Sequence, residues 1–370
     1  MNIKDLFEPM NVTLRRLNNI RRWTGYQTEG RYDEISKQAL NCIICFILAT
    51  EVEASGKIIK WERFPKIAMY RAFQKAYVNF DTPEPILKKI CAIGNIQFEE
   101  TFKKVTFDII LERTNSDIAV WISEGEATLE EDIYKAATKI ATLLELNEVQ
   151  KHVNGEYGTN YQEIINSMIK YSNIPCFDKL SDTKGDYFKV FKEISKLRNQ
   201  NRWAAYSYNV ECSVLGHLFD TAIFAYLMAI EKGEKERKAA QYFFMGIFHD
   251  VPEAFTRDIP SPIKDKIPGF RELTEQYEMK MMEQEVYPYV SEDVEIALKK
   301  VMMEDKENAE FKPLLKGADY LSATSEIWRQ YMDPNFAETM VRQGNQFSSD
   351  GKVQVTESAK KLYEKMLKSL

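Results

Sequence analysis

Apolar residues recur at helical spacing in nearly every long segment of this chain, while runs that alternate apolar and polar residues are few. A period of 3.6 residues is typical of helices that bury one face, whereas strands show a period of two. The 370 residues, 44% of them hydrophobic, suffice for two ordinary domains or one large helical domain. We therefore predict an all-α protein.

The charge and composition of the chain limit the kinds of molecule that it can bind. The formal net charge is −6, and no long Lys/Arg run or basic stripe interleaved with aromatic residues occurs, so we expect no duplex nucleic acid partner. This composition does not exclude a basic pocket that binds one small anion. The first residues, MNIKDLFEPM, lack the layout of a secretory signal, and the apolar stretch Ile43–Ala49 is too short to span a bilayer. We expect a soluble, cytoplasmic protein with no membrane partner.

The cysteines do not form an obvious site. Cys42 and Cys45 make a CxxC pattern inside the apolar run ALNCIICFILA, and no second pair follows downstream. We expect buried thiols rather than a metal or redox site. The odd total of five and the expected cytoplasmic location argue against a disulfide framework.

Helix-breaking residues mark the loops between the predicted helices. They fall at Asp81–Pro85, Asn154–Thr159, Ser172–Pro175, Asp258–Pro268 and Gln343–Gly351.

The chain also repeats itself faintly with an offset of about 180 residues, a period that indicates duplicated domains. Three short matches occur in the same order: RW at 22–23 and 202–203, DTPEPI at 81–86 and DIPSPI at 258–263, and KAAT at 135–138 and KGAD at 316–319. We predict two tandem helical domains, residues 1–180 and 181–370.

The second of these halves concentrates side chains that bind metals. His217 lies in a helix-like segment, His249 and Asp250 lie in FHDVPEAFTRDIPSPIK, and Asp319 lies in LLKGADYLSA. Taken singly, His217 could be a core histidine and Asp319 a surface carboxylate. A buried, unpaired aspartate is costly, however, and a cation compensates it. Two imidazoles and two carboxylates suit one divalent transition metal, Mn, Fe, Co, Ni, Cu or Zn, with open positions for water and a phosphate oxygen.

The first half lacks this set. The positions near the predicted ligands carry other side chains: Lys37, Gln38, Gln74, Lys75 and Thr138. Lysine and glutamine cannot reproduce a His/Asp metal shell. We predict a degenerate first half without a catalytic metal, and we expect its single histidine, His152, to be solvated.

Two further carboxylates suit acid–base chemistry. Glu253 follows His249 by four residues, so its carboxylate points to the same side if the helix continues. Pro252 predicts instead a new turn or a distortion at this point. Asp258 lies in the loop beyond, where it could position the nucleophilic water or share the acid–base task. We predict catalytic roles for Glu253 and Asp258.

The ordered set from Arg202 to Asp319 resembles the HD-domain metal-dependent phosphohydrolases, and within them the branch that includes the bacterial 5′-deoxyribonucleotidases. The shared features are the Arg-Trp pair, a histidine fourteen residues on, the His-Asp pair with Glu three further, an Asp before a Pro-x-Pro-hydrophobic-Lys loop, and a late Asp in Lys-x-Ala-Asp.

The resemblance implies a role for each matched position. It implies four metal ligands, His217, His249, Asp250 and Asp319, and acid–base or water-orienting roles for Glu253 and Asp258.

It also implies substrate contacts. Arg202 would hold the 5′-phosphate with its guanidinium fork, and Trp203 would press against the sugar. Ordinary core packing is the alternative for Trp203. Lys264 is a further phosphate candidate, with a solvated loop lysine as the alternative.

Two departures from the family pattern affect the expected activity. The segment before His217 reads SVLGH instead of the EH-S pattern of the characterised nucleotidases, and the chain is about twice their usual length. Because family nucleotidases are commonly homodimers, we hypothesise that residues 1–180 replace a second subunit and pack against the catalytic half, with homo-oligomerisation left open. Two histidines in that half are too few for a two-metal centre, so we predict a mononuclear site.

The leading prediction is a phosphohydrolase that removes phosphate from small nucleotides, with 2′-deoxynucleoside 5′-monophosphates favoured. One alternative is hydrolysis of deoxynucleoside triphosphates, for which Arg257 and Lys264 supply basic groups. Others are hydrolysis of another small phosphate ester and a nucleotide-sensing or scaffold protein that binds metal and nucleotide without turnover. The presence of both Glu253 and Asp258 favours an enzyme.

Overall fold

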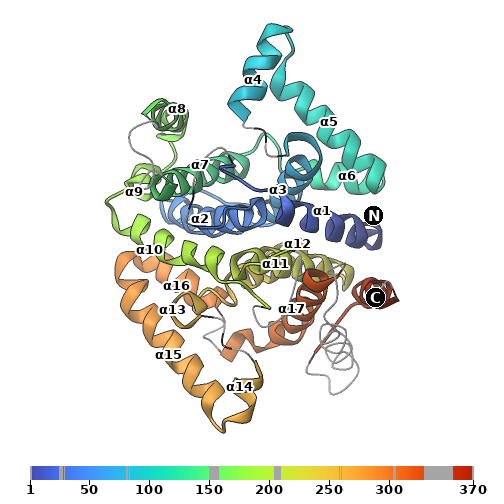
Figure 1. The fold of residues 1–370 in the computed structure, drawn as a ribbon, viewed down its shortest axis with the longest axis vertical. Coiled ribbons are helices and arrows are strands. Elements are labelled where there is room, and N and C mark those ends of the chain that lie inside the picture. Colours follow the sequence, from blue (N-terminus) through green and yellow to red (C-terminus); the bar gives the residue numbers. More distant parts are fainter. Residues whose placement is uncertain are drawn as a thin grey trace.

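The computed structural model describes residues 2–24, 28, 30–80, 82, 84–149, 158–203, 210–257, 259, 261–302, 306–328 and 353–368. Over these residues the chain is helical, with two isolated β-bridges and no strand. The prediction of an all-α fold is confirmed (Figure 1).

The first half, residues 1–180, contributes α1 (Phe7–Asn19), α2 (Glu34–Ala54), α3 (Arg63–Gln74), α4 (Glu84–Ile93), α5 (Phe98–Arg113), α6 (Ser116–Ser123), α7 (Leu129–Val149), α8 (Gly158–Met168) and most of α9 (Phe177–Ser181). A π-helix, Lys75–Asn79, directly extends α3.

The second half, residues 181–370, contributes α10 (Asp186–Ser195), α11 (Val214–Glu231), α12 (Glu236–Phe248), α13 (Glu253–Thr256), α14 (Ser261–Lys266), α15 (Phe270–Glu285), α16 (Glu292–Val301), α17 (Lys312–Ile327) and α19 (Glu357–Lys368). In Figure 1, α4 and α5 project from one end of the molecule, and α14 and α15 project from the opposite end.

Two helices, α2 and α11, form the centre of the molecule. Nearly every residue of both helices is buried, because other helices enclose them. Both are long and apolar enough to cross a membrane, but 100% of the apolar window of α2 and 89% of that of α11 is buried inside the protein. Their composition is therefore that of core helices.

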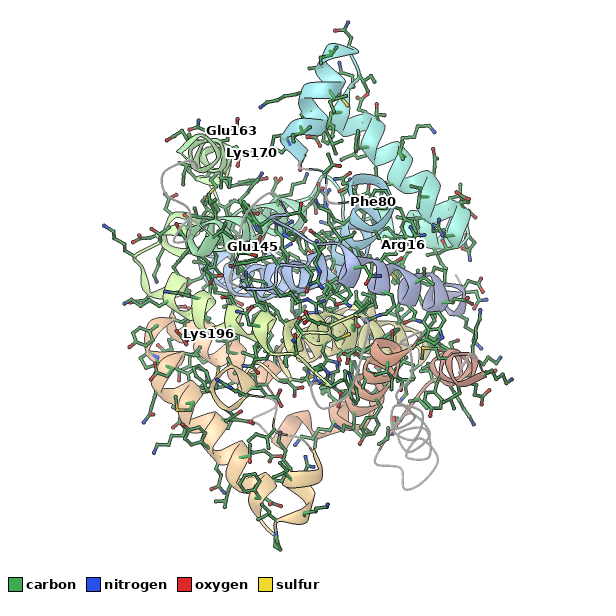
Figure 2. The ribbon with its side chains drawn as sticks, viewed as in Figure 1. Arg16, Phe80, Glu145, Glu163, Lys170 and Lys196 are labelled. Atoms are coloured by element: carbon green, nitrogen blue, oxygen red, sulfur yellow. The ribbon has the colours of Figure 1, made fainter. Side chains whose placement is uncertain are left out.

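The two halves pack against each other where α2 contacts α11, and one hydrophobic cluster includes residues of both halves. Side chains fill the space between these helices (Figure 2). The division at residue 180, and the idea that this packing replaces a second subunit, stay predictions.

Polar contacts also join the halves. The hydroxyl oxygens of Ser36 and Ser213 lie 2.8 Å apart in the buried core. Arg15 of α1 forms an ion pair with Asp220, which is buried in α11. Removing either member of this pair would leave a poorly solvated charge in the core, so the pair specifies how α1 sits on α11.

The local geometry at the two Arg-Trp pairs recurs 180 residues apart. The backbone N–H of Arg22 donates to the carbonyl of Tyr32 at 2.8 Å, and that of Arg202 donates to the carbonyl of Cys212 at 2.8 Å. Trp23 and Trp203 both have positive φ angles, 59° and 62°. Residues other than glycine rarely adopt the left-handed αL backbone conformation. The two Arg-Trp pairs therefore match in backbone conformation as well as in sequence.

The helices that follow these pairs begin alike. Asp33 caps α2 by accepting from the N–H of Ser36 at 2.8 Å, and Ser213 caps α11 by accepting from the N–H of Gly216 at 2.9 Å. Each cap satisfies an N–H that the first helical turn leaves without a partner. The caps fix where α2 and α11 begin, and therefore which residues lie one turn inside.

The predicted loops are only partly observed. Ser172–Pro175 lies between helical segments, as expected, whereas Gln343–Gly351 and His152 lie outside the described residues. The prediction of a continuous loop at Asp258–Pro268 is wrong, because Ser261–Lys266 forms α14. Pro262 occupies the first turn of that helix, where the missing N–H of proline has no intrahelical partner to lose.

The CxxC pair behaves as expected. Cys42 and Cys45 are free thiols buried in α2. Burial raises the pKa of both thiols above the ordinary value, so they are unreactive core side chains.

Candidate metal centre and active site

His217 lies one turn inside α11 and is buried. Its Nδ1 is 2.7 Å from Glu326 Oε1 and 2.9 Å from the hydroxyl of Ser322, and its Nε2 is 3.1 Å from Asp319 Oδ1. A proton on Nδ1 donated to the Glu326 carboxylate leaves the lone pair of Nε2 directed at Asp319. This is the arrangement in which histidine binds a metal.

His249 directly follows α12. Its Nδ1 lies 2.8 Å from the carbonyl oxygen of Gly246, so Nδ1–H donates and Nε2 carries the lone pair. His249 Nε2 is buried without a hydrogen-bond partner in the described part of the chain, although Asp250 Oδ2 lies 3.2 Å away. A buried lone pair without a donor is costly, and a metal ion satisfies it.

A glycine allows α12 to approach α11 at this point. A Cβ built on Gly246 would lie 2.6 Å from Cα of Ala222 in α11, which is closer than real Cβ atoms approach. The close approach brings the end of α12, and with it His249, beside His217. The two imidazole rings have centroids 5.3 Å apart.

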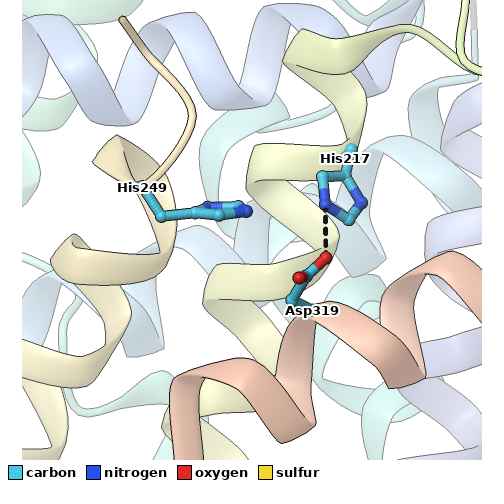
Figure 3. A group of neighbouring side chains, drawn as sticks. All are labelled: His217, His249 and Asp319. Carbon is cyan, nitrogen blue, oxygen red and sulfur yellow. Dashed lines mark hydrogen bonds and ion pairs between the residues drawn. The ribbon is translucent and has the colours of Figure 1, made fainter. Parts of the chain in front are cut away.

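His217, His249 and Asp319 each offer one ligand atom, and these atoms all lie within 4.8 Å of one another (Figure 3). The three side chains come from α11, the end of α12 and α17. Asp250 stands next to His249 and outside this three-residue cluster, but its carboxylate is within reach through the 3.2 Å contact. The donor set of two imidazole nitrogens and carboxylate oxygens fits a divalent transition metal.

Electrostatics keep the carboxylates of the cluster ionised. Burial alone would raise the pKa of Asp250 and of Asp319. Without a metal, protonated His249 outweighs burial for Asp250, and Lys316 with protonated His217 outweighs it for Asp319; a bound cation would replace the positive charge of the two imidazolium rings. Both pKa values are held below the ordinary value. Two carboxylates that stay negative in a buried site attract a cation.

Glu326 connects the metal cluster to the Arg-Trp pair. Its Oε2 accepts from Nε of Arg202 at 2.9 Å and from the indole N–H of Trp203 at 2.8 Å, while Oε1 faces His217. Burial would raise the pKa of Glu326, but Arg202 and His217 lower it to about 2. One ionised carboxylate therefore orients His217, Arg202 and Trp203 together.

Glu253 begins α13 and is buried. The helix that precedes His249 ends at Phe248, and Pro252 precedes the new helix, so the predicted new turn is confirmed. Lys264 Nζ lies 3.6 Å from Glu253 Oε1, so the structure brings together these two predicted residues. Asp258 lies outside the described residues.

Sequence reasoning missed two polar neighbours of the cluster, Glu326 and Ser322, and assigned no role to Lys316. Lys316 Nζ lies 2.6 Å from Asp319 Oδ2. Glu326 follows Asp319 by seven residues, which places both on one face of α17. That spacing, together with the matching Glu145 in the first half, could have identified Glu326 from the sequence.

The helical fold and the His, His-Asp and Asp arrangement are those expected of a phosphohydrolase domain of the HD type. Residues 189–365 match the family model described as 5′-deoxynucleotidase YfbR-like. This part of the chain is therefore similar to the HD-domain 5′-deoxynucleotidases.

Curated relatives of this chain are also named 5′-deoxynucleotidases. A 5′-deoxynucleotidase of Yersinia pestis (strain Pestoides F) is 27% identical over 136 residues, which cover 36% of this chain and 68% of the relative. A 5′-deoxynucleotidase of Yersinia pseudotuberculosis serotype O:1b (strain IP 31758) has the same identity and coverage. No solved structure matches the chain.

Proposed function

We propose that the second half of this protein removes phosphate from small nucleotides, with 2′-deoxynucleoside 5′-monophosphates as the favoured substrates. The observation that carries the proposal is the cluster of His217, His249 and Asp319, in which Nδ1 of each histidine faces an acceptor and Nε2 is left for a metal. The name of the matching family supplies the substrate class.

In this proposal one divalent metal is held by His217, His249, Asp250 and Asp319. When bound, it supplies a Lewis acid that polarises a phosphoryl oxygen and lowers the pKa of water. The residues around it bind the substrate, orient it and move protons.

Glu253 has the acid–base role. Water attacks phosphorus, the P–O5′ bond breaks, and the products are inorganic phosphate and the nucleoside. Glu253 accepts the proton of the attacking water, and a proton must reach the departing O5′, a step that Asp258 shares in our proposal. The ammonium of Lys264, 3.6 Å from Glu253, adds positive charge where the phosphate would lie.

Arg202 and Trp203 have the recognition roles. The guanidinium of Arg202 would hold the 5′-phosphate, and the ring of Trp203 would lie against the sugar, where a 2′-hydroxyl would be excluded. Glu326 fixes both side chains through the contacts at 2.9 and 2.8 Å. A cytoplasmic location and a mononuclear centre stay predictions.

The test is release of inorganic phosphate from ribo- and deoxyribonucleoside 5′-monophosphates and triphosphates with Mn, Co, Mg or EDTA. We expect metal-dependent release from deoxyribonucleoside monophosphates, its loss in His249→Ala, and a large loss in Glu253→Ala. Lys103→Ala, on the distant α5, is the control and should leave release unchanged. If no nucleotide of the panel releases phosphate while the protein still binds metal, the proposed activity is wrong. If Glu253→Ala turns over at the full rate, the proposed role of Glu253 is wrong.

A further inference from the structure

The first half keeps the recognition geometry of the second half. Arg22 bonds to Glu145 at 2.9 Å, and the indole N–H of Trp23 bonds to the same carboxylate oxygen at 2.9 Å. Glu145, on α7, thus bonds to Arg22 and Trp23 as Glu326 bonds to Arg202 and Trp203. A glutamate carboxylate that orients the Arg-Trp pair is therefore present in both halves.

Lysines stand at or near two of the metal-binding positions, and a third lysine lies beside the position that matches Asp319. Lys37 lies on α2, 180 residues before His217, is 6% exposed, and donates to the hydroxyl of Thr142 at 2.7 Å. Lys75 follows α3 as His249 follows α12. Lys139, on α7, adds a third ammonium and is half-buried.

These ammonium groups share their neighbouring carboxylates with other cations: Glu34, Glu145 and Glu84 attract them but bond elsewhere. Neither Lys37, Lys75 nor Lys139 forms an ion pair within the described residues. Burial, with repulsion from Arg22 and then Lys75, lowers the pKa of Lys37 to about 7, and burial lowers that of Lys139. The carboxylates closest to them have other partners: Glu34 and Glu145 bond to Arg22, and Glu84 bonds to Lys88.

A buried amide at the same place also lacks a partner. Asn41 lies one turn after Lys37 on α2 and is 1% exposed, and over the described residues neither its Nδ2 nor its Oδ1 has a hydrogen-bond partner. Its counterpart 180 residues on is Thr221, whose hydroxyl lies 3.4 Å from the metal-facing Nε2 of His217. Burying an amide without partners is costly, and a ligand with polar oxygens removes the cost.

We infer that the first half binds a nucleoside 5′-phosphate without metal and without hydrolysing it, the phosphate facing Lys37, Lys75 and Lys139. The nucleoside part of this inference rests on the proposed function, which assigns phosphate and sugar to the equivalent Arg-Trp pair. Three ammonium groups replace the charge of the metal in neutralising the phosphate. Since lysine cannot lower the pKa of water as a metal does, the site holds the ligand and does not cleave it.

The test measures binding of dAMP and of inorganic phosphate to the full chain in EDTA by titration calorimetry. An Arg202→Ala background removes the proposed phosphate contact of the second half. Lys75→Ala and Lys139→Ala should each weaken binding about tenfold or more, the effect of losing one charge-assisted contact. Lys103→Ala, a half-buried lysine of the same half paired with Glu126, is the control and should bind as the parent does.

Trp23→Ala separates nucleotide from phosphate. It should weaken binding of dAMP and leave inorganic phosphate unaffected. Binding that Lys75→Ala and Lys139→Ala leave unchanged, or no binding in EDTA, would overturn the site. Equal affinity for dAMP and inorganic phosphate would overturn its assignment to a nucleotide.

Phosphate release by the metal-loaded wild-type protein, measured on the same preparation, separates the two proposals. Turnover without binding in EDTA would contradict this inference alone. Binding in EDTA that depends on the lysines, with no turnover, would contradict the proposed function alone.

Discussion

Gly246→Ala tests how closely α11 and α12 must approach for the metal cluster to form. The added Cβ would lie 2.6 Å from Cα and 2.8 Å from the backbone nitrogen of Ala222. Both atoms belong to the backbone of α11, so no side-chain rotation relieves the contact. The two helices must separate before ordinary contact distances of 3.4–4 Å are reached.

The magnitude follows from two opposing effects. Alanine is favoured over glycine inside a helix by about 1 kcal/mol. Forcing an extra carbon into a packed core costs about 1–3 kcal/mol, and a clash with backbone belongs at the upper end. We therefore expect the free energy of unfolding to fall by about 2 kcal/mol. Metal affinity should fall about 10- to 100-fold, because the shift displaces His249 and the carbonyl that orients it.

The assay is urea unfolding in EDTA, followed by calorimetric titration with Mn or Co. Gly94→Ala is the control, because its Cβ would meet the side chain of Ile96 at 3.4 Å and the carbonyl oxygen of Cys91 at 3.8 Å, both ordinary contact distances. If Gly246→Ala unfolds at the same urea concentration as Gly94→Ala and binds metal as tightly, then close helix approach does not build this site.

Three further changes test other parts of the structure. Glu326→Gln removes the charge that receives Nδ1–H of His217, so calorimetry should show metal affinity reduced about 10- to 100-fold, and unchanged affinity would contradict the orienting role. Burial alone would raise the pKa of Glu34, but Lys75 and a neighbouring arginine lower it to about 2, so its stabilisation is present above pH 4.5 and is lost as the pH falls toward 2. Glu34→Gln should remove on the order of 3 kcal/mol at pH 7 and little at pH 2, and equal losses at both pH values in urea unfolding would refute this. Ser213→Ala removes the cap of α11 and should cost about 1–2 kcal/mol in thermal unfolding, with no loss as the contrary result.

The helices, and the candidate metal ligands that the fold brings together, could be named from the sequence because both depend on local patterns; metal binding by these residues stays a prediction. Helical spacing of apolar residues identified α2 and α11, and the rarity of histidine drew attention to His217 and His249. Glu326 was missed because a glutamate in a helix of mixed polarity is ordinary. Its importance comes from burial and from three partners that the fold assembles.

Other features depend on backbone geometry that side-chain patterns do not encode. α14 escaped prediction because two prolines and a serine resemble a loop, although Pro262 suits a first helical turn. The isolated amide of Asn41 is visible only once α2 is known to be enclosed on every side.

The contact between α2 and α11 joins parts of a single polypeptide, and this has consequences that a homodimer would not share. The association of the halves is intramolecular, so diluting the protein does not separate them, and the midpoint of thermal unfolding should not depend on protein concentration. A homodimer also receives every substitution twice, once in each copy. Here a lysine can stand at position 37 while a histidine stands at position 217. Each molecule can therefore contain two different sites, one of each kind.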